Sequence, residues 1–245
     1  MTDVLLVEEP AEGILLLRLN RPAQRNAIDV ALLDAMNAAF DDFTAKGRWR
    51  AAVLTGTAPA FCAGLDLKTF SAPDAPRAAV TALIQRVPHL GKPIIAAVGG
   101  AAYTGGLELA LSCDFILASE GARFADTHAK IGALSGSGMG SRLPHAVGAR
   151  FARQMMLSCM PIDAATALRV GLINELLPAD GLLPRAVEVA MAIAAHDPGL
   201  IRIAKGVIDR GSETTLAEAL AIETHALEKR KAEGAMTWNR TPSPQ

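Results

Sequence analysis

One stretch of the sequence, KPIIAAVGGAAYTGGLELALSCD at residues 92–114, places the strongest limits on the fold. Ile94–Val98 is a short apolar run with β-branched residues, and it ends at Gly99-Gly100, as is typical of a buried strand. Leu107–Cys113 is apolar but interrupted by polar residues, which favours a helix. The stretch therefore predicts a strand, a glycine turn and a helix in immediate succession.

A single carboxylate, that of Glu108, stands in the first turn of this predicted helix. Gly105 and Gly106 precede it and allow the backbone to approach a ligand closely. The first N–H groups of a helix have no partner within the helix and are free to bind an oxygen atom. Backbone donors beside a carboxylate suit proton transfer next to a carbonyl group, although the helix dipole alone also favours a glutamate here.

Composition and charge exclude several classes of protein. The chain has 245 residues, of which 51% are hydrophobic and 20% charged, so it can bury a sizeable core. Its net charge of −1 provides no basic surface for nucleic acid or an anionic membrane. No apolar run approaches about 18 residues without a charge, so we expect no membrane span.

The cysteines indicate the compartment. Cys62, Cys113 and Cys159 are odd in number and lack the spacing of metal ligands. We therefore expect a reduced, cytoplasmic setting, no metal site, and a core-packing role for Cys62 and Cys113. The N-terminal MTDVLLVEEP has no basic region followed by an apolar run, so we expect no secretory signal.

Periodicity and turn residues predict the other elements before residue 120. The predicted strands are Val4–Val7, Ile14–Leu19, Ala52–Leu54 and Phe115–Ala118, and the predicted helices are Val30–Thr44, capped by Asp29, and Ala78–His89. A polar turn is predicted between the first two strands. Residues 58–68, APAFCAGLDLK, predict a loop that leads into a helix.

The last third of the chain is predicted to be mostly helical from its capping residues. These are Asp163 before a helix that stops at Gly171, Asp197-Pro198 before a helix that ends at Gly211, and a capping box of Thr215 and Glu218 before a helix that reaches about Gly234.

The segment FADTHAKIGALSGSGMGSRLP, residues 124–144, is rich in glycine and serine and contains Asp126 and His128. Its GSGMGS run does not fit a dinucleotide-binding motif, because no strand comes immediately before it and its last position is serine. In an extended stretch, residues 126 and 128 would face the same side. A lone histidine such as His128 is more often structural than catalytic.

Five motifs in one order give the chain a specific resemblance. They are LNRPAQRNAI, AFCAGLDLK, KPIIAAVGGAAYTGGLELALSCD, RLPHAVG and PIDAATALRVGLINELLP. From about residue 4 to residue 234, the chain resembles the enoyl-CoA hydratase/isomerase (crotonase) family. The resemblance implies an α/β fold: a repeated ββα spiral core at residues 1–190 that holds an acyl-CoA site, then a helical region at residues 191–245 that builds a homotrimer or a hexamer.

The same resemblance implies roles for individual residues. The backbone N–H groups of Leu65 and Gly105 correspond to the pair that holds the thioester oxygen. Glu108 corresponds to the first of two catalytic glutamates. His128 stands where the second glutamate is usual, and Asp126 could supply a carboxylate instead. The positions that line the CoA groove are Arg25, Ala27, Ala63, Asp66 and Leu67.

We therefore predict an enoyl-CoA hydratase that adds water across the double bond of a 2-enoyl-CoA thioester, without a metal or redox cofactor. The replacement of the second glutamate leaves two alternatives open. One is an enoyl-CoA isomerase or another enolate reaction, such as decarboxylation or thioester hydrolysis. The other is an acyl-CoA-binding protein with negligible catalysis.

Overall fold

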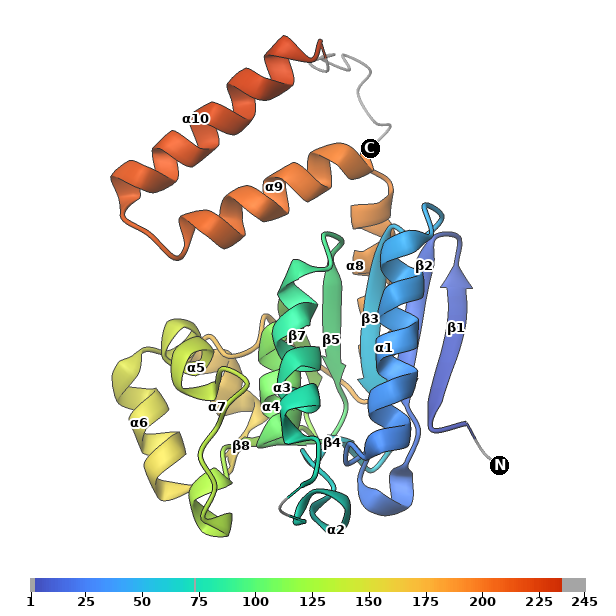
Figure 1. Cartoon of the computed structure of the whole chain (residues 1–245), viewed down its shortest axis with the longest axis vertical. Coiled ribbons are helices and arrows are strands. Elements are labelled where there is room, and N and C mark those ends of the chain that lie inside the picture. Colours follow the sequence, from blue (N-terminus) through green and yellow to red (C-terminus); the bar gives the residue numbers. More distant parts are fainter. Residues whose placement is uncertain (1–2, 73, 235–245) are drawn as a thin grey trace. The chain divides into compact units, whose positions relative to one another are not determined.

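The computed structural model describes residues 3–72 and 74–234, and Figure 1 shows the path of the chain. The chain forms two compact units, Met1–His196 and Asp197–Gln245. The predicted division between residues 190 and 191 lies inside helix α8 (Leu182–Ala194), which packs on a sheet of the first unit.

The first unit contains all the strands and most of the helices that the structure describes. Its strands are β1 (Leu5–Ala11), β2 (Ile14–Leu19), β3 (Ala51–Gly56), β4 (Ala60–Cys62), β5 (Ile94–Val98), β6 (Ala101–Tyr103), β7 (Phe115–Ser119), β8 (Arg123–Ala125), β9 (Ile162–Asp163) and β10 (Glu175–Leu177). Its α-helices are α1 (Val30–Ala45), α2 (Leu67–Phe70), α3 (Arg77–Arg86), α4 (Gly105–Ser112), α5 (Met139–Val147), α6 (Ala149–Ser158), α7 (Ala164–Arg169) and α8. Its 3₁₀ turns are η1 (Pro22–Gln24), η2 (Val87–His89) and η3 (His128–Ile131).

The strands form two sheets that share a repeated chain path. The larger sheet has the order β1-β2-β3-β5-β7-β10 and is parallel except between β1 and β2. The smaller sheet has the order β4-β6-β8-β9 and is parallel except between β8 and β9. The pairs β3–β4, β5–β6 and β7–β8 each contribute their first strand to the larger sheet and their second to the smaller one. A helical segment follows each pair, which gives a repeated ββα arrangement.

The larger sheet has an apolar layer on each face. Successive residues of a strand point to opposite faces, so Ile94 and Ala96 of β5 join one cluster and Ile95 and Ala97 join the other. Helices α1, α3 and α4 cover the first face, and α8 covers the second (Figure 1). Strand β5 is therefore packed against buried side chains on both faces of the sheet, and α4 belongs to the first of these two layers.

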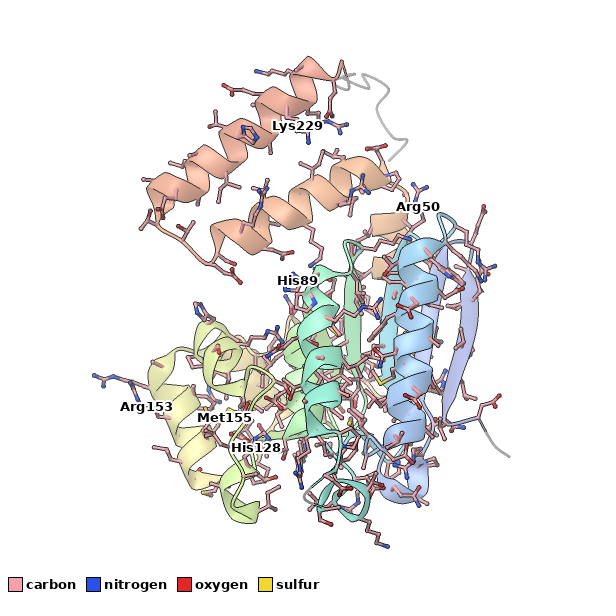
Figure 2. All side chains as sticks on the ribbon, in the orientation of Figure 1. Arg50, His89, His128, Arg153, Met155 and Lys229 are labelled. Carbon is pink, nitrogen blue, oxygen red and sulfur yellow. The ribbon has the colours of Figure 1, made fainter. Side chains whose placement is uncertain are left out.

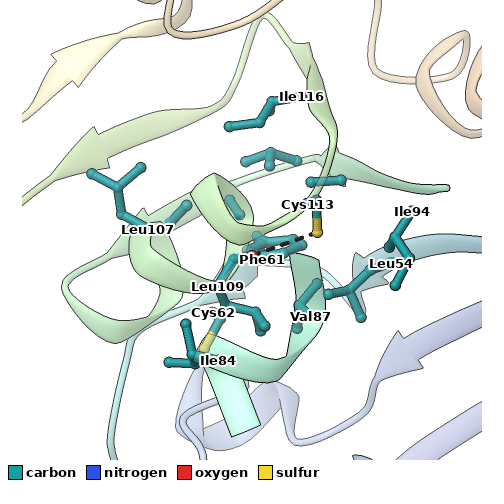
Figure 3. Close-up of a cluster of buried hydrophobic side chains, with 14 of the residues drawn as sticks. Leu54, Phe61, Cys62, Ile84, Val87, Ile94, Leu107, Leu109, Cys113 and Ile116 are labelled. Carbon is teal, nitrogen blue, oxygen red and sulfur yellow. Dashed lines mark hydrogen bonds between the residues drawn. The ribbon is translucent and has the colours of Figure 1, made fainter. Parts of the chain in front are cut away.

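The first cluster contains Cys62 and Cys113, the cysteines of two of the sequence motifs. Figure 3 shows Phe61, Cys62 and Cys113 among side chains of β3, α3 and α4. Cys62 and Cys113 are buried, as predicted for core residues. Burial raises the pKa of the Cys62 thiol to about 12, although a hydrogen bond with the Gly64 backbone opposes the rise, so this thiol is not a nucleophile near neutral pH.

Several local predictions are confirmed and others are wrong. Strands β2 and β5 have the predicted bounds, and Asp29 caps α1 by accepting a hydrogen bond from Leu32 N at 2.8 Å. Strand β1 continues into the predicted turn and ends at Ala11, which is possible because it is an edge strand and tolerates Pro10. Strands β4, β6 and β8 were missed, since three residues are too few to show an alternating pattern.

The second unit is a helical hairpin of α9 (Pro198–Gly211) and α10 (Leu216–Ala232). Both predicted caps are confirmed: Asp197 accepts from Leu200 N, and Thr215 forms a capping box with Glu218. Arg230 Nη2 lies 3.8 Å from Asp197 Oδ1, so the end of α10 returns to the start of α9. Neither helix contains a buried residue within the described part of the chain.

Within residues 3–72 and 74–234, every helix is too short or too polar to cross a bilayer.

Candidate active site

Glu108 is the most deeply buried carboxylate of the predicted site. It lies in the first turn of α4 and is only 2% exposed. Its Oε1 atom accepts hydrogen bonds from the Ser135 hydroxyl, from Ser137 N at 3.1 Å and from Met139 N at 3.2 Å. Three donors on one oxygen fix the orientation of the carboxylate and leave Oε2 directed elsewhere.

The glycine- and serine-rich segment supplies all three of these donors. Residues 135–139 lead into α5, whose first N–H groups have no partner within the helix. The N–H of Met139 belongs to this set, and it also donates to Ser135 Oγ at 3.1 Å. The segment that the sequence excluded as a dinucleotide motif therefore serves as a cradle for Glu108. Sequence reasoning missed Ser135 and Ser137, and their clustering between glycines was the only signal.

His128 faces the other oxygen of Glu108. Its Nε2 lies 3.9 Å from Glu108 Oε2, and its side chain is 13% exposed. His128, which is labelled in Figure 2, is the first residue of η3. The pair is too far apart for a direct hydrogen bond and close enough for both groups to contact one small molecule such as water. The structure thus brings together Glu108 and His128, the two residues to which the family resemblance assigns the positions of the glutamate pair.

Asp126 lies behind His128 and does not face Glu108. Its Oδ1 is 2.6 Å from His128 Nδ1 and also accepts the backbone N–H of His128 at 3.1 Å. Asp126 is buried. The expected extended conformation was wrong, because η3 begins at His128 and the chain turns there. The two side chains still meet, since Asp126 Oδ1 accepts the backbone N–H of His128 and lies beside its ring.

The protonation of His128 reflects opposing influences. Burial alone lowers the pKa of His128. The hydrogen bond and negative charge of Asp126, together with the charge of Glu108, outweigh that effect and raise the pKa above its ordinary value of 6.5. His128 therefore keeps its proton to a higher pH than a free histidine does.

The AGLD turn and the TGG turn lie side by side, as the predicted oxyanion hole requires. A Cβ built on Gly105 would lie 3.7 Å from Leu65 N, and one on Gly64 would lie 3.1 Å from Gly105 N. Gly64 has a φ of +99°, which only glycine adopts readily. Within the described residues, Leu65 N and Gly105 N donate no hydrogen bond. Both donors remain available for a ligand oxygen.

Thr104 connects this turn to the histidine segment. Its φ of +54° is unusual for a β-branched residue and stores local strain. Thr104 N donates to Ala125 O at 2.9 Å, and the Thr104 and Thr127 hydroxyls share a hydrogen bond of 2.6 Å. The position of Gly105 N is thereby tied to the segment that carries Asp126 and His128.

The first loop is fastened to the AGLD turn by two residues that sequence reasoning missed. Arg21 pairs with Asp66 at 3.1 Å and with Asp29 at 2.9 Å. Asn26, which is fully buried, donates to Ala60 O at 2.7 Å and to Thr57 O at 2.8 Å. Both residues belong to the LNRPAQRNAI motif, and that motif was the only sequence signal for them.

The predicted CoA-groove residues lie in the first loop and around the AGLD turn, and their side chains differ in exposure. Arg25 is exposed and its carbonyl accepts Ala63 N at 3.0 Å, while Ala27 is buried. Leu67 is 53% exposed. The Asp66 side chain accepts hydrogen bonds from Arg21 and from Lys68 N, and its backbone N–H donates to Ile28 O at 2.8 Å. Burial opposes ionisation of Asp66, but these donors lower its pKa overall.

The described residues contain no group of three histidine, cysteine, aspartate or glutamate side chains arranged to hold a metal ion. The groups that the site offers are a fixed carboxylate, a histidine–aspartate pair and two backbone N–H donors without a partner in the described structure. Such a set can polarise a carbonyl oxygen and move protons at the neighbouring carbon atoms.

The chain is similar in sequence and in structure to known proteins. The sequence profile of the enoyl-CoA hydratase/isomerase family matches residues 9–237. A probable enoyl-CoA hydratase of Rhizobium meliloti (strain 1021) is 38% identical over 224 residues, which cover 90% of this chain and 87% of that protein. The crystal structure of an enoyl-CoA hydratase from Bacillus anthracis has a TM-score of 0.88 at 32% identity, covering 92% of this chain and 90% of its own.

An isomerase is also among the similar structures. A monofunctional enoyl-CoA isomerase from M. smegmatis has a TM-score of 0.78 at 29% identity and covers 89% of this chain and 98% of its own. These matches confirm the predicted repeated ββα core. By its sequence and by its fold, this chain belongs to the enoyl-CoA hydratase/isomerase family.

Proposed function

We propose that this protein is an enoyl-CoA hydratase in which a glutamate and a histidine carry out the proton transfers. The observation that carries the proposal is the facing pair at 3.9 Å: Glu108, held through one oxygen by three donors, and His128, held by Asp126. A water molecule between the two side chains would contact both. Similarity to enoyl-CoA hydratases over most of the chain supports the substrate class.

The proposed reaction uses one base and one acid. Glu108 takes a proton from water as the water oxygen bonds to the β-carbon of the 2-enoyl group. The electrons of the double bond move toward the thioester, whose oxygen accepts hydrogen bonds from Leu65 N and Gly105 N. His128 then donates its Nε2 proton to the α-carbon. Return of a proton from Glu108 to His128 restores the starting state, so one water molecule is consumed in each turnover.

The two backbone donors and the nearby turns complete the proposed site. A donor that binds the developing oxyanion is worth about 3 to 4 kcal/mol of transition-state stabilisation. We assign the CoA groove to Arg25, Ala27, Ala63, Asp66 and Leu67. The reaction as written needs no redox or metal cofactor.

Turnover of crotonyl-CoA tests this proposal directly. We expect the purified full-length protein to remove the conjugated-enone absorbance of crotonyl-CoA and to give a product heavier by one water molecule. In a parallel arm, 3-enoyl-CoA is followed for the appearance of the conjugated enone. Conjugation of 3-enoyl-CoA without hydration of crotonyl-CoA would instead identify an isomerase, and binding without either reaction would identify an acyl-CoA-binding protein.

The isomerase is the second candidate because a double-bond shift needs only one base. The structure holds one carboxylate facing the site where the family resemblance implies two, and a similar solved structure is an isomerase. A second carboxylate matters more for activating water than for moving a proton between two carbon atoms. Its replacement by His128 therefore weakens hydration more than isomerisation.

The pH dependence of the reaction tests the role of His128 as the acid. An acid must be protonated to act, so the raised pKa of His128 extends activity above pH 6.5, and activity falls as the pH rises through the raised value. Asp126→Asn keeps an acceptor oxygen but removes the charge that raises this pKa. We expect the alkaline limb of kcat/KM to move to lower pH, with a loss of about tenfold near pH 8 and a smaller loss near pH 6.

The exposed Asp180→Asn change is the matched control and leaves the profile unchanged. A shift of the acid limb in Asp126→Asn would show that His128 acts as a neutral base, which contradicts the assignment made above.

Assembly and location are part of the same proposal. The hairpin of α9 and α10 exposes large apolar side chains, among them Ile208 (68%), Leu216 (76%) and Leu220 (55%). Such side chains gain by burial between subunits, which supports a role of this region in a homotrimer or hexamer. A cytoplasmic location remains the expectation from the cysteine pattern.

A further inference from the structure

We infer that Ser135 is a positioning residue for Glu108: its hydroxyl aims the reactive carboxylate oxygen at the substrate and at His128. This inference rests on the proposed function and adds a residue to it. Ser135 lies in the loop before α5 and is half-buried, while Glu108 lies in α4. Neither the family motifs nor local sequence patterns assign Ser135 a role.

The hydrogen-bond pattern around Ser135 fixes the direction of its proton. Ser135 Oγ accepts the N–H of Met139 at 3.1 Å and contacts Glu108 Oε1. A carboxylate oxygen only accepts, so the hydroxyl must be the donor in the second contact. Its one proton therefore points at Glu108, and one of its acceptor sites is filled by the backbone.

The two carboxylate oxygens of Glu108 therefore have different contacts. Oε1 is held by Ser135 and by two backbone N–H groups, and Oε2 lies 3.9 Å from His128 Nε2. Both backbone donors remain when the Ser135 side chain is removed. The carboxylate then stays near its place but loses one of the three hydrogen bonds that fix its rotation, so Oε2 is less well aligned.

Misalignment of a base has a kinetic signature that a loss of folding does not share. Substrate binding depends on the CoA groove and on the backbone donors at Leu65 and Gly105, none of which contacts Ser135 in the described structure. The chemical step depends on Oε2. The expected effect of removing the hydroxyl is therefore on kcat and not on KM.

The test compares three serine variants of the full-length protein in the crotonyl-CoA assay. In Ser135→Ala we expect kcat to fall about tenfold with KM changed less than about twofold, as for the loss of one hydrogen bond to a charged group. Ser135→Thr restores the hydroxyl and is expected to recover most of kcat. Ser141→Ala, an exposed change in the same segment, keeps the wild-type rate.

Each other outcome has a distinct meaning. An unchanged kcat in Ser135→Ala, while the wild type hydrates crotonyl-CoA, overturns the role of Ser135 and leaves the hydratase proposal intact. A rise in KM equal to the fall in kcat, or no recovery in Ser135→Thr despite a wild-type thermal midpoint, also overturns it. Absence of turnover in the wild type, on both crotonyl-CoA and 3-enoyl-CoA, overturns both proposals.

Discussion

Replacing Glu108 with glutamine is expected to lower kcat for crotonyl-CoA hydration by about 10²- to 10⁴-fold, the usual contribution of a positioned acid or base. Glutamine has the same shape, and its amide oxygen can accept the three hydrogen bonds that now reach Oε1. Its NH₂ group then replaces Oε2 and cannot take a proton from water. The change therefore removes the base and keeps the cradle.

Binding and a matched control separate this effect from damage to the fold. We expect the Glu108→Gln variant to bind an acyl-CoA with nearly wild-type affinity in a calorimetric titration. Glu120→Gln, on an exposed turn after β7, keeps the wild-type rate. Hydration by Glu108→Gln at the wild-type rate would show that another group is the base and that the proposed mechanism is wrong.

Gly106→Ala is expected to have the largest effect on folding. A Cβ at this position would lie 2.0 Å from Cys62 O and 2.7 Å from Cys62 C, so the backbone of α4 or of β4 must move. Overpacking of this kind costs about 3 kcal/mol. For a chain of this length, that cost corresponds to a fall in Tm of about 6 to 12 °C, measured by differential scanning calorimetry.

The same displacement reaches the site, because Gly105 N and Glu108 are on the same turn of α4. We therefore expect Gly106→Ala to lose hydration activity even at temperatures where it remains folded. Gly140→Ala is the control: its Cβ would meet only Met156 Cε at 3.9 Å, and alanine is the better helix former. A wild-type Tm for Gly106→Ala would show that β4 and α4 are not closely packed.

The sequence by itself determined the elements whose signals are local. Strand β5 is a continuous apolar run with glycines at its end, so its bounds could be predicted. Asp29, Asp163, Asp197 and Thr215 were identifiable as N-caps because a cap bonds to backbone groups two or three residues away. Glu108 and the first N–H groups of its helix were identified as a candidate site in the same way, through glycines beside a helix start, whereas the role of Leu65 was implied only by the family resemblance.

Only the tertiary structure decided how these pieces meet. Ser135 and Glu108 are 27 residues apart and come together because the loop before α5 packs over α4. Asp126 could not be placed behind His128 from sequence, since a 3₁₀ turn replaced the expected extended chain. Strands β4, β6 and β8 form because they pair with one another in the smaller sheet. Three residues are too few to show a strand pattern in the sequence. Local propensity fixes caps and long periodic segments, whereas contacts between distant segments depend on packing that no single segment encodes.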